Sequence, residues 1–162
     1  MTQQNSDKNS PVSTILVCID TTNASEVTLR YACYKAKLTG FAVQVLAVIE
    51  NSHKNLLFGA KAIGNEKRQQ LEKYITKLTE STYKETHIMP AISIREGDIV
   101  TEIIREIKVM PNCAMLVFGK SYNSLSDNTV LPKIAQKIGH KIRVPITIVP
   151  ENLGEDFFKK LI

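Results

Sequence analysis

Short runs of apolar residues recur along the chain, and a segment with helical spacing follows almost every one of them. The first run, residues 14–19 (TILVCI), is apolar throughout after its first residue. Continuous apolar runs of this length are typical of strands buried on both faces, whereas a sheet with one face in water gives an alternating pattern. The run therefore predicts a parallel sheet with a helix layer on each side.

The rest of the chain continues this alternation. Further strands are predicted at residues 41–49, 91–94, 115–118 and 146–149, and amphipathic helices at about 22–40, 65–84, 98–107 and 132–142. This order predicts an α/β fold of the Rossmann-like kind, an open five-stranded parallel sheet with helices on both faces. The domain is expected at residues 13–150, between a disordered N-terminal tail at 1–12 and a C-terminal segment at 151–162.

Charge and cysteine usage narrow the classes of function. The net charge is +5, but the lysines and arginines are spread along the sequence without a block of like charge, which favours a solvated basic surface over nucleic-acid binding. The three cysteines lack CxxC spacing and are interpreted as reduced, buried residues. No stretch is apolar enough for a membrane helix, and the N-terminus lacks a secretory signal, so a cytoplasmic protein is expected.

Two residues follow predicted strands at the edge where open α/β sheets bind ligands, which is the carboxyl end of the strands. Asp20 ends the first strand and Gly119 ends the fourth. Each also has a structural interpretation: Asp20 as a cap of the first helix, and Gly119 as a residue that lets the chain turn. The three histidines lack metal-ligand spacing, and no nucleophile has a neighbouring base, so neither a metal site nor a catalytic site is predicted.

Four segments in this order resemble the universal stress protein family. They are ILVCID and the helix after it (15–50), REGDIVTEII (95–104), MLVFG (115–119) and RVPITIVP (143–150). The resemblance spans about residues 13–150. It implies a small cytoplasmic domain that acts without catalysis, in stress resistance or regulation, through dimerisation and contacts with partners.

The phosphate-binding pattern of nucleotide-binding family members is mostly lost. That pattern is Gly, two residues, Gly, nine residues, Gly, then Ser or Thr; here the four positions are Gly119, Tyr122, Pro132 and Lys133. A bulky Tyr122 disfavours positive φ, and Pro132 removes a backbone N–H at the start of a helix. Little or no ATP binding and no cofactor are therefore expected.

Two alternatives stay open. The first is a nucleotide-binding module that keeps weak affinity for ATP or AMP through Asp20, backbone groups of the second strand and Lys133. In the resemblance, the acid that matches Asp20 lies beside the adenine and ribose, and Lys133 would attract a phosphate by charge. Lys133 is otherwise a solvated helix lysine. The second alternative is an enzyme of another doubly wound family.

The last predicted strand is expected to form a homodimer. The apolar run from Val144 to Val149 lies near the chain end, where the topology predicts a sheet edge, and a bare edge invites pairing. Val144, Ile146 and Ile148 are the candidate interface residues, and the family resemblance implies a dimer through the same strand. In the alternative, the C-terminal segment covers this edge itself with Phe157, Phe158 and Leu161.

Overall fold

The computed structural model describes residues 10–50, 60–121, 130–137 and 139–161, with side chains described from residue 64 in the second range and from 133 in the third. Most of the predicted tail, most of residues 51–61 between the second predicted strand and the helix after it, and Tyr122 lie outside these residues. The elements are β1 (Thr14–Cys18), α1 (Ala24–Thr39), β2 (Ala42–Ile49), α2 (Ala60–Thr86), β3 (Ala91–Glu96), α3 (Ile99–Val109), β4 (Cys113–Lys120), α4 (Val130–Lys137), β5 (Ile146–Pro150) and α5 (Glu155–Lys159).

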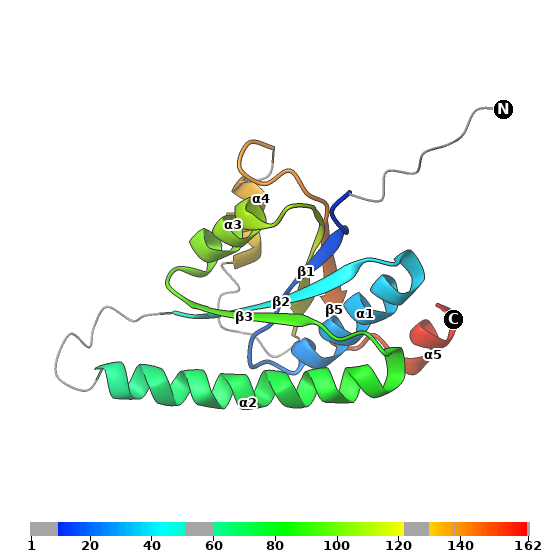
Figure 1. The fold of residues 1–162 in the computed structure, drawn as a ribbon, viewed down its shortest axis with the longest axis horizontal. Helices are drawn as coiled ribbons and strands as arrows, with labels where there is room; N and C mark the ends of the chain where they lie inside the picture. The colour runs from blue at the N-terminus through cyan, green and yellow to red at the C-terminus, as the bar shows by residue number, and fades with distance from the viewer. Residues whose placement is uncertain (1–9, 51–59, 122–129, 138, 162) are drawn as a thin grey trace.

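The five strands form one sheet in the order β3-β2-β1-β4-β5, and every neighbouring pair is parallel (Figure 1). Val17 at the centre of β1 lies opposite Val45 of β2 and Val117 of β4. The predicted open five-stranded parallel sheet is confirmed. The strand order reverses between β1 and β4, so the crevice for a ligand is expected at their carboxyl ends.

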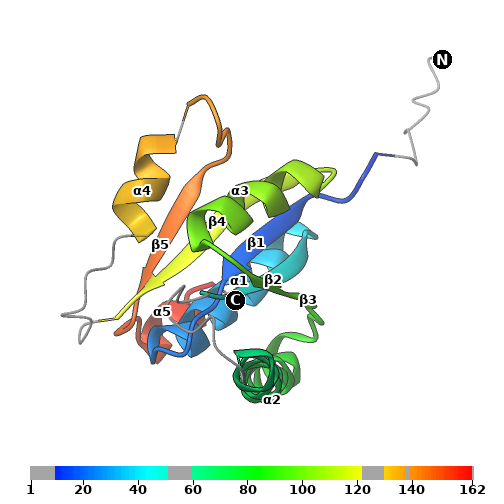
Figure 2. The ribbon, with the colours of Figure 1, turned by 90° about the vertical axis from the view of Figure 1, so that its left-hand side faces the viewer.

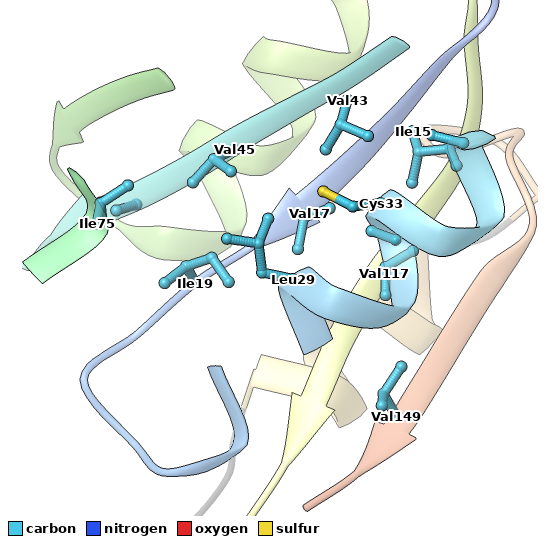
Figure 3. Close-up of a cluster of buried hydrophobic side chains, with 13 residues drawn as sticks. Ile15, Val17, Ile19, Leu29, Cys33, Val43, Val45, Ile75, Val117 and Val149 are labelled. Atoms are coloured by element: carbon cyan, nitrogen blue, oxygen red, sulfur yellow. The ribbon is translucent and has the colours of Figure 1, made fainter. Parts of the chain in front are cut away.

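Helices cover both faces of the sheet, as predicted (Figure 2). Helices α1 and α2 lie on one face, over a core that includes Val17, Leu29 and Ile75 (Figure 3). Helices α3 and α4 lie on the other face, over a second core that includes Leu16, Ile103 and Ile134. Alternate residues of β1 enter opposite cores, which is why its sequence is an unbroken apolar run.

The last predicted helix is too long at its C-terminal end. Helix α4 ends at Lys137 rather than at residue 142. Gly139 has φ +101°, in the region that favours glycine, and its N–H donates to the Ile142 carbonyl at 3.0 Å. The resulting turn still brings Ile142 into the core, where it is fully buried, so the helical spacing of this residue was a misleading signal.

The last strand begins at Ile146, as predicted, and extends one residue further than predicted, to Pro150. Val144 precedes β5 in a bend and packs against the second core. The strand pairing starts after it, where Leu116 donates its N–H to the carbonyl of Pro145 at 2.9 Å. Strand β5 lies at the sheet edge, as predicted.

The C-terminal segment packs on α1. Phe158 of α5 is buried, its ring lies 5.3 Å from that of Tyr34, and the guanidinium carbon of Arg30 lies 4.2 Å from the Phe158 ring centroid. Arg30 also pairs with Glu155 on α5 and with Glu85 on α2. Its contacts therefore fasten α5 to the helices of the first face. None of the described helices is both long and apolar enough to cross a membrane.

Candidate functional site

A small cavity lies at the carboxyl ends of β1, β2 and β4, where the strand order reverses. Its volume is about 60 Å³. Asp20 and Gly119 both line it, together with Ser25 and a mostly apolar wall of Cys18, Ile19, Leu46, Val48, Ile99, Ile103 and Phe118. The structure thus brings together two of the three residues that the sequence nominated, at the edge where they were expected.

Asp20 is engaged in the turn between β1 and α1. One carboxylate oxygen accepts hydrogen bonds from the Thr22 N–H at 2.8 Å, the Thr22 hydroxyl at 2.6 Å and the Ser25 hydroxyl at 2.9 Å. The Asp20 backbone N–H also lies within hydrogen-bonding distance of the Ser25 oxygen, at 3.2 Å. These contacts give Asp20 a structural role, which is one of its two predicted interpretations. The carboxylate stabilises the turn before α1, however, and does not cap the first N–H groups of the helix itself. The described part of α1 has no side-chain cap from Asn23.

Gly119 lies within β4, and α1 packs directly on it. A Cβ atom at this position would lie 2.3 Å from the Thr28 hydroxyl oxygen and 2.9 Å from the Ala24 Cβ. Thr28 is fully buried, and its hydroxyl donates to the Ala24 carbonyl at 2.5 Å, so it has little freedom to move aside. Gly119 is therefore required for close packing between helix and strand, rather than for a turn after the strand.

Lys133 lies apart from this cavity. It is exposed on α4 and lines a separate groove between α3 and α4, together with Asp98 and Thr101 of α3. Asp98 accepts a hydrogen bond from the Thr101 N–H at 2.9 Å and caps α3, as its position predicts. The pKa of Asp98 is lowered mainly by the hydrogen bonds from Thr101, and Lys133 adds a smaller effect of the same sign.

The described residues offer little for catalysis. They contain no group of three or more His, Cys, Asp or Glu side chains that would hold a metal ion. The cavity has one thiol, Cys18, and burial raises its pKa well above the ordinary range. A thiol held neutral in this way is a poor nucleophile and a poor metal ligand. Among the described residues that line the cavity, Cys18 is thus not an activated nucleophile.

Sequence reasoning missed two features of this region. The first is the role of Thr28, whose hydroxyl occupies the space beside Gly119. The groove beside Lys133 was also missed, because its lining comes from two helices and a turn separated by some twenty residues of sequence. Helical-wheel plots of α3 and α4, read side by side, would have revealed this groove.

The family comparison covers nearly the whole domain. Residues 11–150 match the model of the Universal stress protein family. No curated protein sequence matches the chain.

Solved structures share the fold at low identity. Universal stress protein UspA from Lactobacillus plantarum superposes with a TM-score of 0.72 at 15% identity, covering 87% of this chain and 99% of its own. The universal stress protein from Archaeoglobus fulgidus in complex with dAMP has a TM-score of 0.60 at 14% identity, over 87% and 99% of the two chains. A universal stress protein in complex with cAMP has a TM-score of 0.53 at 15% identity, over 86% and 98%.

Proposed function

The chain belongs to the universal stress protein family, and from this premise we propose that it is a non-enzymatic, cytoplasmic member that acts in stress response or regulation through dimerisation and contacts with protein partners. In this proposal it binds adenine nucleotides weakly or not at all. Two relatives of the same fold are complexes with dAMP and cAMP, so the absence of nucleotide binding is the part of the proposal that needs an argument from this chain.

The size of the cavity carries this argument. Its volume of about 60 Å³ holds a few water molecules, whereas pockets for ligands the size of a nucleotide are roughly 300–1,000 Å³. The residues that narrow it are core residues of the domain: Ile103 is fully buried and Phe118 nearly so. Enlarging the cavity for an adenine ring would therefore require the core to repack.

Asp20 is held in the turn by one of its two carboxylate oxygens. Its carboxylate already accepts three hydrogen bonds inside the turn. All three contacts reach Oδ1, so a ribose hydroxyl could approach the second oxygen without displacing them, and Asp20 does not by itself exclude a ribose. Lys133, the only candidate phosphate ligand with a positive charge, lines a different groove.

A degenerate nucleotide-binding module is the alternative, because Asp20 and Gly119 do line one cavity at the expected edge. The two proposals differ in what the purified protein carries. If the protein is denatured and its supernatant is separated by ion-exchange chromatography, we expect no stoichiometric ultraviolet-absorbing nucleotide. A stoichiometric peak of ATP or AMP would overturn the proposal in favour of the module.

The dimer is proposed to form by pairing of two β5 edges. Leu116 donates to the Pro145 carbonyl, and the Glu151 N–H donates to the Lys120 carbonyl, both at 2.9 Å. In a parallel ladder the groups of alternate residues point the same way, so the odd residues from 145 to 151 bond to β4. The N–H groups of Ile146 and Ile148 therefore point outward.

Of the three candidate interface residues, Ile148 is the most available. Its side chain is 51% exposed, whereas Val144 and Ile146 pack partly against the second core. The C-terminal segment packs on α1 through Phe158, and none of the described backbone hydrogen bonds of residues 151–161 goes to Ile146 or Ile148. A second copy, antiparallel about a two-fold axis, would satisfy the outward groups of this edge.

Proline substitution tests the outward and the inward N–H groups of β5 one at a time. Ile148→Pro removes an outward N–H and leaves the bonds to β4 intact, so we expect a folded monomer in sedimentation where the wild type is a dimer at tens of micromolar. Thr147→Pro is the matched control: it removes an inward donor and should destabilise the domain. A monomeric wild type, or a dimer that survives Ile148→Pro unchanged, would contradict the proposed interface.

A further inference from the structure

The groove between α3 and α4 is the larger hollow of the two and is strongly basic. Its volume is about 560 Å³. The two helices lie side by side on the same face of the sheet (Figure 2). Five cationic side chains line the groove: Arg105, Lys108, Lys133, Lys137 and Lys141. The remaining lining residues are Asp98, Val100, Thr101, Ile104 and Gln136.

The excess charge of the chain gathers at this groove. The sequence has 21 lysines and arginines and 16 acidic residues. Among the described residues, five of those cations but a single carboxylate, Asp98, line the groove. The rest of the chain therefore has 16 cationic and 15 acidic residues and is nearly neutral. The residues that line this groove thus account for most of the net positive charge of the chain.

Most of these charges lack an acidic neighbour. Arg105 pairs with Glu102 at 2.6 Å, and Lys133 lies close enough to Asp98 to affect its carboxyl group. Among the residues that the structure describes, Lys108, Lys137 and Lys141 have no ion pair. These three lie along both walls of the groove, so an anion in the groove would meet charge from either side.

The lysines of this groove repel one another in the free protein. Lys133 and Lys137 are one helical turn apart on α4, and the Lys141 N–H bonds to the Lys137 carbonyl at 3.1 Å, which keeps the third lysine close to the second. Like charges at this spacing destabilise a helix. An anionic ligand would relieve this repulsion.

We propose that the groove between α3 and α4 binds an acidic segment of a partner protein. The proposal rests on the proposed role in partner contacts and names the chemistry of one such partner. Carboxylates of the segment would pair with Lys108, Lys137 and Lys141, and its apolar side chains would contact Val100 and Ile104 at the base of the groove.

A polypeptide fits this lining better than a nucleic acid does. Val100 is buried and Ile104 is half-buried, and a phosphate backbone has no apolar group to place against them. Asp98 would repel a nearby phosphate, whereas a peptide can present a lysine or a polar side chain there. None of the described residues that line the groove is aromatic, so this part of the chain offers no platform for base stacking.

Binding of a model acidic peptide tests the proposal. The probe is a fluorescein-labelled peptide of about a dozen residues, mostly glutamate with leucine at every third or fourth position. In anisotropy titrations at low salt we expect saturable binding by the full chain that weakens as salt is added. The triple variant Lys108→Gln, Lys137→Gln, Lys141→Gln should weaken binding by roughly tenfold or more.

A matched control removes three exposed lysines from the opposite face. Lys73→Gln, Lys77→Gln and Lys84→Gln on α2 change the net charge equally and should leave peptide affinity within about twofold. Circular dichroism of both triple variants checks that they fold. Equal losses in the two triple variants would show attraction to net charge alone and overturn the proposal.

Two other results would also overturn it. One is no saturable binding of the peptide by the wild type. The other is tighter binding of a single-stranded RNA oligonucleotide of equal charge, or of inorganic tripolyphosphate, that the groove variant abolishes. Neither result bears on the nucleotide content of the purified protein or on its dimerisation, so the groove can fail while the proposed function stands.

Discussion

The cavity beside Asp20 and the groove beside Lys133 belong to the same sheet but differ in almost every physical respect. The cavity is about 60 Å³ with mostly apolar walls, whereas the groove is about 560 Å³ with five cationic side chains. The cavity occupies the position where open α/β sheets bind ligands. In our proposal, the domain keeps the customary ligand position but narrows it with core residues, while the charges suited to recognition line an outer surface.

Packing explains why the cavity is small. Helix α1 approaches β4 so closely at Gly119 that a single methyl group has no room. On the other side of the sheet, Ile99 and Ile103 of α3 enter the cavity wall. Helices α3 and α4, by contrast, contact one another through few residues, and the charged side chains of both helices line the space between them.

The largest expected effect concerns the packing at Gly119. Gly119→Ala places a Cβ atom 2.3 Å from the Thr28 hydroxyl oxygen, and overpacking of this kind costs about 1–3 kcal/mol. We expect that loss in the free energy of unfolding, measured with urea. Gly64→Ala in α2 is the matched control, because a Cβ there has no heavy atom within 4 Å and should stabilise the helix by up to about 1 kcal/mol.

If Gly119→Ala left the free energy of unfolding unchanged, the contrast between the tightly packed cavity and the open groove would fail, because α1 would then move away from β4 easily. The same freedom would allow the cavity to open for a ligand. Thr28→Ala in the Gly119→Ala background should then restore nothing; in our account it restores part of the lost stability.

A smaller effect is expected for Lys133→Ala, which separates the two regions directly. Lys133 lines the groove and is absent from the cavity lining. We expect affinity for the acidic peptide to fall by roughly two- to fivefold, as the loss of one exposed charge contact would give. Nucleotide binding, measured in parallel, should not change. A loss confined to nucleotide binding would assign Lys133 to the cavity.

The smallest effect is expected for Asp98, the one carboxylate that lines the groove. The lowered pKa of Asp98 means that its cap stabilises the fold above the pKa of the unfolded chain, and that this contribution is lost as the pH falls through the lowered folded value. Asp98→Asn should keep the cap, abolish this acid dependence, and tighten peptide binding by about twofold. Urea unfolding as a function of pH and the anisotropy titration measure the two effects. Weaker peptide binding by this variant would contradict the proposed polarity of the groove.

The sheet and its helices could be predicted because strands that are buried on both faces have continuous apolar sequences. The unbroken run in β1 arises from residues that enter two cores in turn, such as Leu16 and Val17. The position of Asp20 and Gly119 at the carboxyl edge followed from the strand order. The ends of the elements were less predictable. The turn at Gly139 buries Ile142, a residue that the spacing of a longer helix would also bury.

The character of the candidate site could be predicted only in part. The lost glycine pattern predicted weak phosphate binding, but nothing in the sequence revealed that Thr28 fills the space beside Gly119. The charge of the groove was invisible for a related reason. Its cations are dispersed between residues 105 and 141, and only the packing of α3 beside α4 brings them together.

Calorimetric titration of ATP into the purified wild-type protein tests the central claim most directly. The titration should be made at physiological salt, with nucleotide-free protein and with adenosine as a second ligand. Since the described residues enclose a cavity of only about 60 Å³, the account predicts no saturable heat, or a Kd weaker than about 1 mM. Saturable binding of ATP with a Kd in the low micromolar range would contradict it.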